Sequence, residues 1–231
     1  MPLNTFNQEV GEALPDFTSG NLPDITILKG NYCTIEHIDA IKHLDDIADF
    51  YWKSAVESDW TYYFDAPYTS MEAVKKCLDG YQVSKDPYFF AIRDNDSQKV
   101  LGTFALMSIK PNFRSIEMGC VMYSQKLQKT RVATEAQYLM MTYVFEELGY
   151  RRYEWKCDSL NLPSSRAAKR LGFQYEGTFR NAVVYKNRSR DTDWFSIIDS
   201  EWQTNKLRLK NWLNPSNFDD NGDQKKSLEE C

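Results

Sequence analysis

The feature that most constrains the fold is a run of three strand patterns followed by one long helix pattern. Residues 88–92 form a short apolar run, and residues 100–109 and 115–123 flank a Pro-Asn turn, as the two strands of a hairpin do. Residues 132–149 then place apolar side chains at helical spacing. Hairpin strands pair antiparallel, whereas a helix crossing over the sheet leads to a parallel neighbour. The order therefore predicts an α+β fold, with a mixed, mostly antiparallel sheet and helices on both faces.

The remaining segments add strands and helices around this centre. Further strands are predicted at 25–36, 152–157, 173–186 and 191–198, and further helices at 38–57, 71–84, 164–171 and around Trp202 and Trp212. Residues 1–24 hold proline and glycine among polar residues, so we expect an irregular leader that is able to drape over the core. Residues 214–231 are expected to form a flexible polar tail. Residues 25–213 show no repeat or change of composition and are predicted to form one domain.

The charge balance argues against two classes of partner. Lys and Arg number 28 against 33 Asp and Glu, which gives a net charge of −5. Nucleic acids and anionic membranes are bound by clustered positive charge, so we expect neither as a partner. No apolar run approaches the roughly 20 residues that span a bilayer, and no secretion or transit signal is recognisable. We therefore expect a cytoplasmic location.

The cysteines and histidines argue against a metal site. The 5 cysteines are scattered without a Cys-x-x-Cys pair, and His37 and His43 lie six residues apart. On a helix that spacing is a rotation of about 240°, so the two rings cannot bind one metal from one face. We predict reduced thiols and no metal. The glycine-rich nucleotide motifs and the serine-hydrolase elbow are also absent from the sequence.

One basic segment stands apart in this acidic chain. Lys126, Lys129 and Arg131 fall within six residues where the strand at 115–123 leads to the long helix. The first amide groups of a helix have no partner within the helix, and the helix dipole is positive at that end. Two interpretations are open at this point: a phosphate-binding site and an ordinary solvated basic loop.

Four stretches of the chain resemble the GNAT superfamily of acyl-CoA-dependent N-acetyltransferases, and within it the branch of bacterial ribosomal-protein N-terminal acetyltransferases. They are GTFALMSIKPNFRSIEMGCVMYS at 102–124, LQKTRVATEAQYLMMTYVFEELGYRRYEWKCD at 127–158, NLPSSRAAKRLGFQYEGTFR at 161–180 and RDTDWFSIIDSEW at 190–202. The family's pyrophosphate motif, Gln/Arg-x-x-Gly-x-Gly/Ala, maps onto residues 128–133, and its N-x-x-S…L-G-F signature onto residues 161–173. The resemblance covers about residues 25–213 and implies a GNAT fold.

The resemblance also implies acetyl-CoA as co-substrate and roles for individual residues. Those implied to bind it are Cys120, Val121, Tyr123, Gln128, Lys129, Thr130, Arg131, Val132, Ala133, Thr134, Asn161 and Ser164. An acceptor ammonium, with a pKa of about 10.4 if it is lysine-like, must lose a proton before it attacks. Glu117 is the candidate base, its alternative being an outward-facing strand carboxylate, and Ser164 is the candidate acid.

Two positions depart from the family pattern. Arg131 stands in place of the central glycine of the pyrophosphate motif, and we expect its guanidinium to bind phosphate instead. Ala168 stands where many members have a tyrosine that protonates the leaving thiolate.

We predict acetyl transfer to a primary amine, on a small molecule or a peptide or protein N-terminus, by direct attack on the thioester of acetyl-CoA. The departures leave open a catalytically silent acyl-CoA-binding sensor or scaffold, and a further alternative is a protein-binding role of the last helix. The chain is expected to be a monomer or a homodimer. Residues 60–65 are expected mainly in the core, and Lys156 on a buried strand with its amine reaching solvent.

Overall fold

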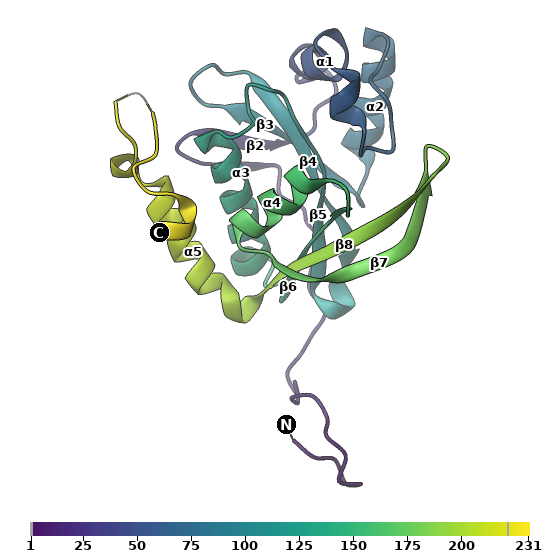
Figure 1. The fold of residues 1–231 in the computed structure, drawn as a ribbon, viewed down its shortest axis with the longest axis vertical. Coiled ribbons are helices and arrows are strands. Elements are labelled where there is room, and N and C mark those ends of the chain that lie inside the picture. The colour runs from purple at the N-terminus through teal and green to yellow at the C-terminus, as the bar shows by residue number, and fades with distance from the viewer. Residues whose placement is uncertain (1, 221) are drawn as a thin grey trace.

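The computed structural model describes residues 2–220 and 222–231, and its centre is one eight-stranded sheet (Figure 1). The strands are β1 (Ile27–Lys29), β2 (Cys33–His37), β3 (Tyr88–Asp94), β4 (Val100–Lys110), β5 (Ser115–Tyr123), β6 (Arg152–Asp158), β7 (Gln174–Tyr185) and β8 (Arg188–Ile198). They lie in the order β1-β2-β3-β4-β5-β6-β8-β7. Neighbours pair antiparallel, except β5 and β6, which are parallel.

The helices lie on both faces of this sheet (Figure 1). They are α1 (Leu44–Ala48), α2 (Met71–Val83), α3 (Arg131–Thr142), α4 (Leu162–Leu171) and α5 (Asp199–Leu213). Side chains of α1 and α2 form one hydrophobic cluster, and those of α3, α4 and α5 form a second one on the opposite face. This arrangement confirms the predicted α+β fold with a mixed, mostly antiparallel sheet.

Local side-chain chemistry explains where the helices begin. Ser70 and Thr130 each accept a hydrogen bond from the amide three residues later, at 3.2 Å, so they cap α2 and α3. The helix predicted at 38–57 is shorter than expected. The carboxylate of Asp39 accepts the amide groups of the next residues and holds them in a turn, so α1 begins only at Leu44.

The last residues of the chain fold back onto the body, which differs from the expected flexible tail. Phe218 lies edge-on against Trp212, with ring centroids 5.1 Å apart. Leu228 is 2 % exposed, and its carbonyl accepts a hydrogen bond from Arg208 at 3.1 Å. Two apolar side chains in an otherwise polar segment are enough to anchor it, because each removes its surface from water. Polar composition alone did not reveal these anchors.

A buried carboxylate fastens α3 to the beginning of the sheet. Glu135 accepts the amide groups of Asn31, Tyr32 and Cys33 at 2.8, 2.6 and 2.8 Å, and its side chain is almost fully buried. The turn between β1 and β2 approaches it so closely that a Cβ on Gly30 would lie 2.4 Å from the carboxylate. Three backbone donors on one charge therefore set the position of α3, and with it the position of the loop that precedes this helix.

We predict that Glu135→Gln lowers the free energy of unfolding by about 2–3 kcal/mol, because the amide group that replaces one oxygen turns a donor toward backbone donors. Denaturant titration measures the difference. Glu147→Gln is the matched control, since Glu147 is exposed, and it should change stability by less than about 0.5 kcal/mol. Equal stability of the two variants would show that Glu135 does not hold the helix.

Candidate functional site

The parallel strands β5 and β6 pair over only part of their length. Their register runs from Ser115 opposite Arg152 to Met118 opposite Trp155, and both strands continue beyond it without pairing to each other. In the unpaired part β5 carries a bulge, because three steps along β5 match two steps along β4 and Cys120 has a φ of +50°. A bulge bends the strand and turns backbone groups out of the ladder. The sheet is therefore open at its centre.

Two predicted residues on this open part of β5 are contacted by side chains from elsewhere. The carbonyl of Val121 accepts a hydrogen bond from the hydroxyl of Tyr63. The hydroxyl of Tyr123 accepts one from Gln137 of α3 at 2.8 Å. Burial raises the pKa of both tyrosines, so both hydroxyls stay protonated. The main chain of β5 thus presents an oxygen that the sheet itself does not use.

The basic segment forms the loop from β5 to α3, as predicted. Lys126, Gln128 and Lys129 are exposed, and Lys129 has a φ of +62°. Within the described chain, no acceptor receives the amide groups of Lys129, Arg131 or Val132. Free backbone donors, the positive end of a helix and two exposed lysines make this loop suited to an anion.

Within α3, the next three predicted residues have structural surroundings. Ala133 donates its amide to the Thr130 cap, Thr134 is buried next to Arg170 of α4, and Val132 is half-buried against the core. These residues belong to the first turn of the helix. They would therefore affect anion binding through the position of that turn more than through their side chains.

Arg131 does not direct its guanidinium toward that loop. The group lies over the ring of Tyr32 at 4.9 Å and over the ring of Phe218 at 4.5 Å, so it is held between the β1–β2 turn and the folded-back tail. Arg131 is also the first residue of α3 and has helical backbone, so this position does not need the conformational freedom of glycine. The arrangement differs from the expected contact of its side chain with phosphate.

Glu117 lies in a buried cluster of charges, so the interpretation as an outward-facing strand carboxylate is wrong. It is 6 % exposed, and its Oε2 accepts hydrogen bonds from Ser108 at 2.9 Å and from Lys156 at 2.5 Å. The ammonium of Lys156 also contacts Glu154 at 2.8 Å and lies 4.1 Å from the centre of the Trp194 ring. We expected the amine of Lys156 to reach solvent, but the structure differs, because the carboxylates of Glu117 and Glu154 hold the amine within the cluster.

The charge cluster continues along β6, where basic neighbours favour the ionised form of the second carboxylate, Glu154. Arg152 donates to Glu154 at 2.7 Å and also pairs with Glu176 of β7. Although burial opposes ionisation, the hydrogen bonds from Arg152 and Lys156 lower the pKa of Glu154. The face of β5 and β6 next to the opening therefore carries paired charges, while their other face packs into the core.

Asn161 and Ser164 lie on that other face, at the start of α4. Asn161 caps the helix by accepting the amide of Ser164 at 3.2 Å, and the hydroxyl of Ser164 accepts a hydrogen bond from Trp155 at 3.0 Å. Trp155 and Lys156 are adjacent on a strand and point to opposite faces. Glu117 and Ser164 are therefore on opposite sides of the opening. Ala168 is fully buried in the core.

The aromatic segment at 60–65 joins three parts of the molecule. Trp60 is a core residue, as expected, and Tyr63 packs half-buried against the same cluster, whereas Phe64 and Asp65 are exposed. Tyr62 donates to the carbonyl of Leu160 at 3.0 Å, and the ring of Phe64 lies 5.5 Å from that of Tyr185 in the β7–β8 hairpin. Together with the contact of Tyr63 on β5, these bonds place the segment over the opening between β5 and β6. No periodicity in the sequence indicates this position, since the contacts join segments far apart along the chain.

Two absences among residues 2–220 and 222–231 bear on the class of site. No group of three or more His, Cys, Asp or Glu side chains in these residues could hold a metal ion. No helix in the same residues has the length and apolar character needed to cross a membrane.

The family model of the acetyltransferase (GNAT) domain matches residues 38–174. That range is more than half of the chain, and the chain belongs to this family. A curated relative, the uncharacterized N-acetyltransferase YnaD of Bacillus subtilis, is 30% identical over 86 residues, which are 37% of this chain and 50% of the relative. The chain spans about half to two thirds of the length of the curated relatives it matches.

Solved structures are similar over nearly the whole chain. A GCN5-related N-acetyltransferase from Brucella melitensis is 43% identical, with a TM-score of 0.91 over 94% of this chain and 98% of that one. A Chromobacterium violaceum protein described as a probable acetyltransferase of the GNAT family is 33% identical, with a TM-score of 0.78 over 85% of this chain and 98% of that one. These matches confirm the predicted GNAT fold.

We predict that the bulged cysteine reacts slowly near neutral pH. Although the residue is exposed on the bulge, the protein atoms around its thiol keep water away and, together with the negative charge of Glu117, raise the pKa of Cys120 to about 11, so little thiolate exists at pH 7. The rate of alkylation by iodoacetamide should rise about tenfold per pH unit and level off near pH 11. Mass spectrometry of the peptide that contains Cys120 measures this rate, with glutathione as reference. A rate at pH 7 equal to that of glutathione would contradict the assigned environment.

Proposed function

We propose that the protein transfers an acetyl group from acetyl-CoA to a primary amine. The observation that carries the proposal is the opening between β5 and β6, with free helix donors at one end of it and the Glu117 cluster on one face. Membership of the GNAT acetyltransferase family supports the same reaction. The acceptor class remains as broad as the sequence predicted, a small amine or a peptide or protein N-terminus.

The residues around the opening suit coenzyme A. The free amide groups of Lys129, Arg131 and Val132 would hold the diphosphate, and the charges of Lys126 and Lys129 would add to the attraction. The exposed edge of β5 at Val121 and Tyr123 would receive the pantetheine arm as one more strand. Tyr63 must release the Val121 carbonyl if that oxygen is to accept a hydrogen bond from the arm. Asn161 and Ser164 would support the arm from the other face.

The reaction needs a base at the amine. The acceptor ammonium gives a proton to Glu117, directly or through a water, and its nitrogen then attacks the thioester carbonyl carbon. The new C–N bond forms as the C–S bond breaks, and the thiolate takes up a proton as it leaves. Backbone N–H groups at Cys120 and Val121 are suited to polarise the carbonyl oxygen, because the bulge turns them out of the ladder.

The hydrogen bonds of Glu117 suit this role. Ser108 and Lys156 both bind its Oε2, whereas no residue that the structure describes donates to its Oε1. Oε1 lies on the side of Gly119, 3.8 Å from the position that a Cβ there would take. One oxygen is therefore anchored and the other is free to accept a proton next to the bulge. Lys156 acts here as a positioning residue.

A second function, an acyl-CoA-binding sensor or scaffold without turnover, is favoured by one observation. Ala168 is buried where many members of the family have a tyrosine, so the phenol that would protonate the thiolate is absent. The hydroxyl of Ser164 accepts a hydrogen bond from Trp155 and keeps its own proton free, but an aliphatic hydroxyl is a much weaker acid than a phenol. Binding without turnover would therefore be the outcome if no other group or water protonates the thiolate.

The loop before α3 is tested by charge reversal. We predict that Lys126→Glu with Lys129→Glu raises the Kd for coenzyme A at least about tenfold, because two attractions to phosphate become repulsions. Isothermal titration calorimetry measures the Kd. The matched control, Lys76→Glu with Lys210→Glu, changes two exposed lysines on α2 and α5 and should leave it unchanged. An unchanged Kd in the loop variant would place the diphosphate elsewhere.

The base is tested by turnover. With acetyl-CoA and a pool of amines, release of free thiol should fall by about 10²–10⁴-fold in Glu117→Gln while the Kd for coenzyme A stays constant. Lys156→Met should lower kcat by about tenfold to a hundredfold, whereas Lys156→Arg keeps the ion pair and most of the activity. A wild-type protein that coenzyme A stabilises, by about 2.7 kcal/mol at a hundredfold excess over Kd, but that releases no thiol would be the silent binder.

A further inference from the structure

The first residues of the chain form an arm, which we define as residues 2–17. Figure 1 shows the arm running away from the body, beyond the end of the sheet where β4 turns into β5. It does not drape over the core, and nearly all of its side chains are exposed. Large apolar side chains recur along it, with Phe6 80 % exposed: Leu3, Phe6, Val10, Leu14 and Phe17. Isolated exposed apolar residues are ordinary, but a series on one projecting segment is typical of a binding segment.

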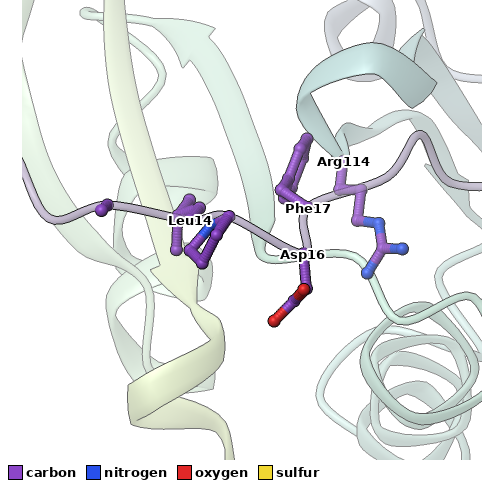
Figure 2. Close-up of a pocket in the computed structure, with 6 residues that line it drawn as sticks. Leu14, Asp16, Phe17 and Arg114 are labelled. Atoms are coloured by element: carbon purple, nitrogen blue, oxygen red, sulfur yellow. The ribbon is translucent and has the colours of Figure 1, made fainter.

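The base of the arm is held firmly, so its direction is set by the body. Figure 2 shows Phe17 beside Arg114 and Asp16 on the other side of the backbone, and the guanidinium lies 5.4 Å from the Phe17 ring centre. Arg114 also donates to the hydroxyl of Thr18 at 2.9 Å. Gly20 donates its amide to the carbonyl of Pro111 at 3.0 Å. The arm therefore leaves a fixed point and does not fold back onto its own sheet.

The charge of this region has one sign. Residues 2–24 contain four acids, Glu9, Glu12, Asp16 and Asp24, and no lysine or arginine. A surface that binds the arm should therefore combine exposed apolar side chains with positive charge.

The β7–β8 hairpin has this combination. Residues 174–198 contain four bases and three acids; the bases are Arg180, Lys186, Arg188 and Arg190. Each of the three acids has a partner within the body: Glu176 pairs with Arg152, Asp191 accepts the amide of Asn181, and Asp193 accepts a hydrogen bond from Thr178. Lys186 and Arg190 contact their own chain, but the side chains of Arg180 and Arg188 form no hydrogen bond or ion pair with any described residue. On this hairpin two cations are thus free for another partner.

Strand β7 is also the edge of the sheet, and most of its side chains are exposed. Phe179 and Val184 are 56 % and 78 % exposed. A bulge at Asn181 interrupts the pairing with β8, and a hollow of about 560 Å³ lies over Phe179, Arg180 and Asn181. A bulge keeps an edge strand from adding further strands, so side-chain contacts in the hollow are the means of binding here.

We infer that the arm of one copy binds along the β7–β8 hairpin of a second copy. Its acidic residues face Arg180 and Arg188, and an exposed aromatic side chain such as Phe6 enters the hollow. The occupant is a second copy because the arm leaves the body at the end of the sheet opposite the hairpin tip (Figure 1). A two-fold axis then gives two such contacts, since each chain offers one arm and one hairpin.

The inferred contact lies close to the candidate site. The rings of Phe179 and Trp194 are stacked, with their centroids 4.6 Å apart. The ammonium of Lys156 lies over the same Trp194 ring. The arm of the second copy would therefore cover the surface next to the Glu117 cluster. The inference concerns assembly and stands independently of the proposed acetyl transfer.

The test is a pair of charge reversals read by sedimentation or light scattering on the full chain. The arm variant carries Glu9→Lys, Glu12→Lys and Asp16→Lys, and the hairpin variant carries Arg180→Glu and Arg188→Glu. The wild type is expected to be a dimer, and each variant alone should dissociate with a Kd raised at least about tenfold. An equimolar mixture of the two variants should form the dimer again, because each arm then meets a hairpin of opposite charge. Phe6→Ser should weaken the dimer without any change of charge.

Each other outcome overturns the inference. A wild type that is monomeric at high concentration has no such interface, and a dimer unaffected by both reversals uses another surface. Variants that dissociate but do not associate when mixed would show that the arm and the hairpin are not partners of each other. The Lys76→Glu, Lys210→Glu control should remain dimeric, and circular dichroism of all variants checks that they are folded.

Discussion

The site depends on the point where two parallel strands stop pairing. β5 and β6 are joined through Met118 and Trp155 and then separate, which leaves backbone groups of β5 without a strand partner at the centre of the sheet. Unpaired backbone groups are costly when buried, so such an opening persists only where other groups satisfy them. Here the bulge at Cys120 turns part of the edge away, and the hydroxyl of Tyr63 binds the Val121 carbonyl. The same groups are those a strand-like ligand would engage.

The charge cluster next to the opening follows from the same geometry. Placing Glu117, Glu154 and Lys156 on one face of adjacent strands removes three charges from water, and only close pairing offsets that loss. The net charge of the three is negative, with Arg152 and Ser108 supplying further donors. A buried cluster of this kind adds little net stability, because the loss of hydration offsets most of the attraction. Its position next to the bulge therefore favours the proposed role of Glu117 in proton transfer over a purely structural role.

The sequence predicted the elements well because their signals are local. The Ser70 cap, the hairpin of β4 and β5 and the long helix are encoded within a few residues of each position. Predictions failed where neither periodicity nor composition reports the contact that decides the outcome. Asp39 shortens α1 through a local turn that periodicity does not detect, while Phe218 and Leu228 anchor a tail that reads as polar. The residue types of the loop before α3 indicated an anion site, but not that Arg131 would turn between two rings.

The amino-acid sequence by itself determined the order of strands and helices, the acidic balance, the basic loop before α3 and the resemblance to the GNAT superfamily. Each is a property of residue types at short separation, where hydrogen-bonding and apolar periodicity act along the chain. Tertiary structure alone decided that Glu117 is buried against Lys156, that Ser164 lies across the sheet from it, and that Tyr63 reaches Val121. Those contacts join residues 39 to 58 positions apart or on opposite faces, so they exist only once the sheet has set its register.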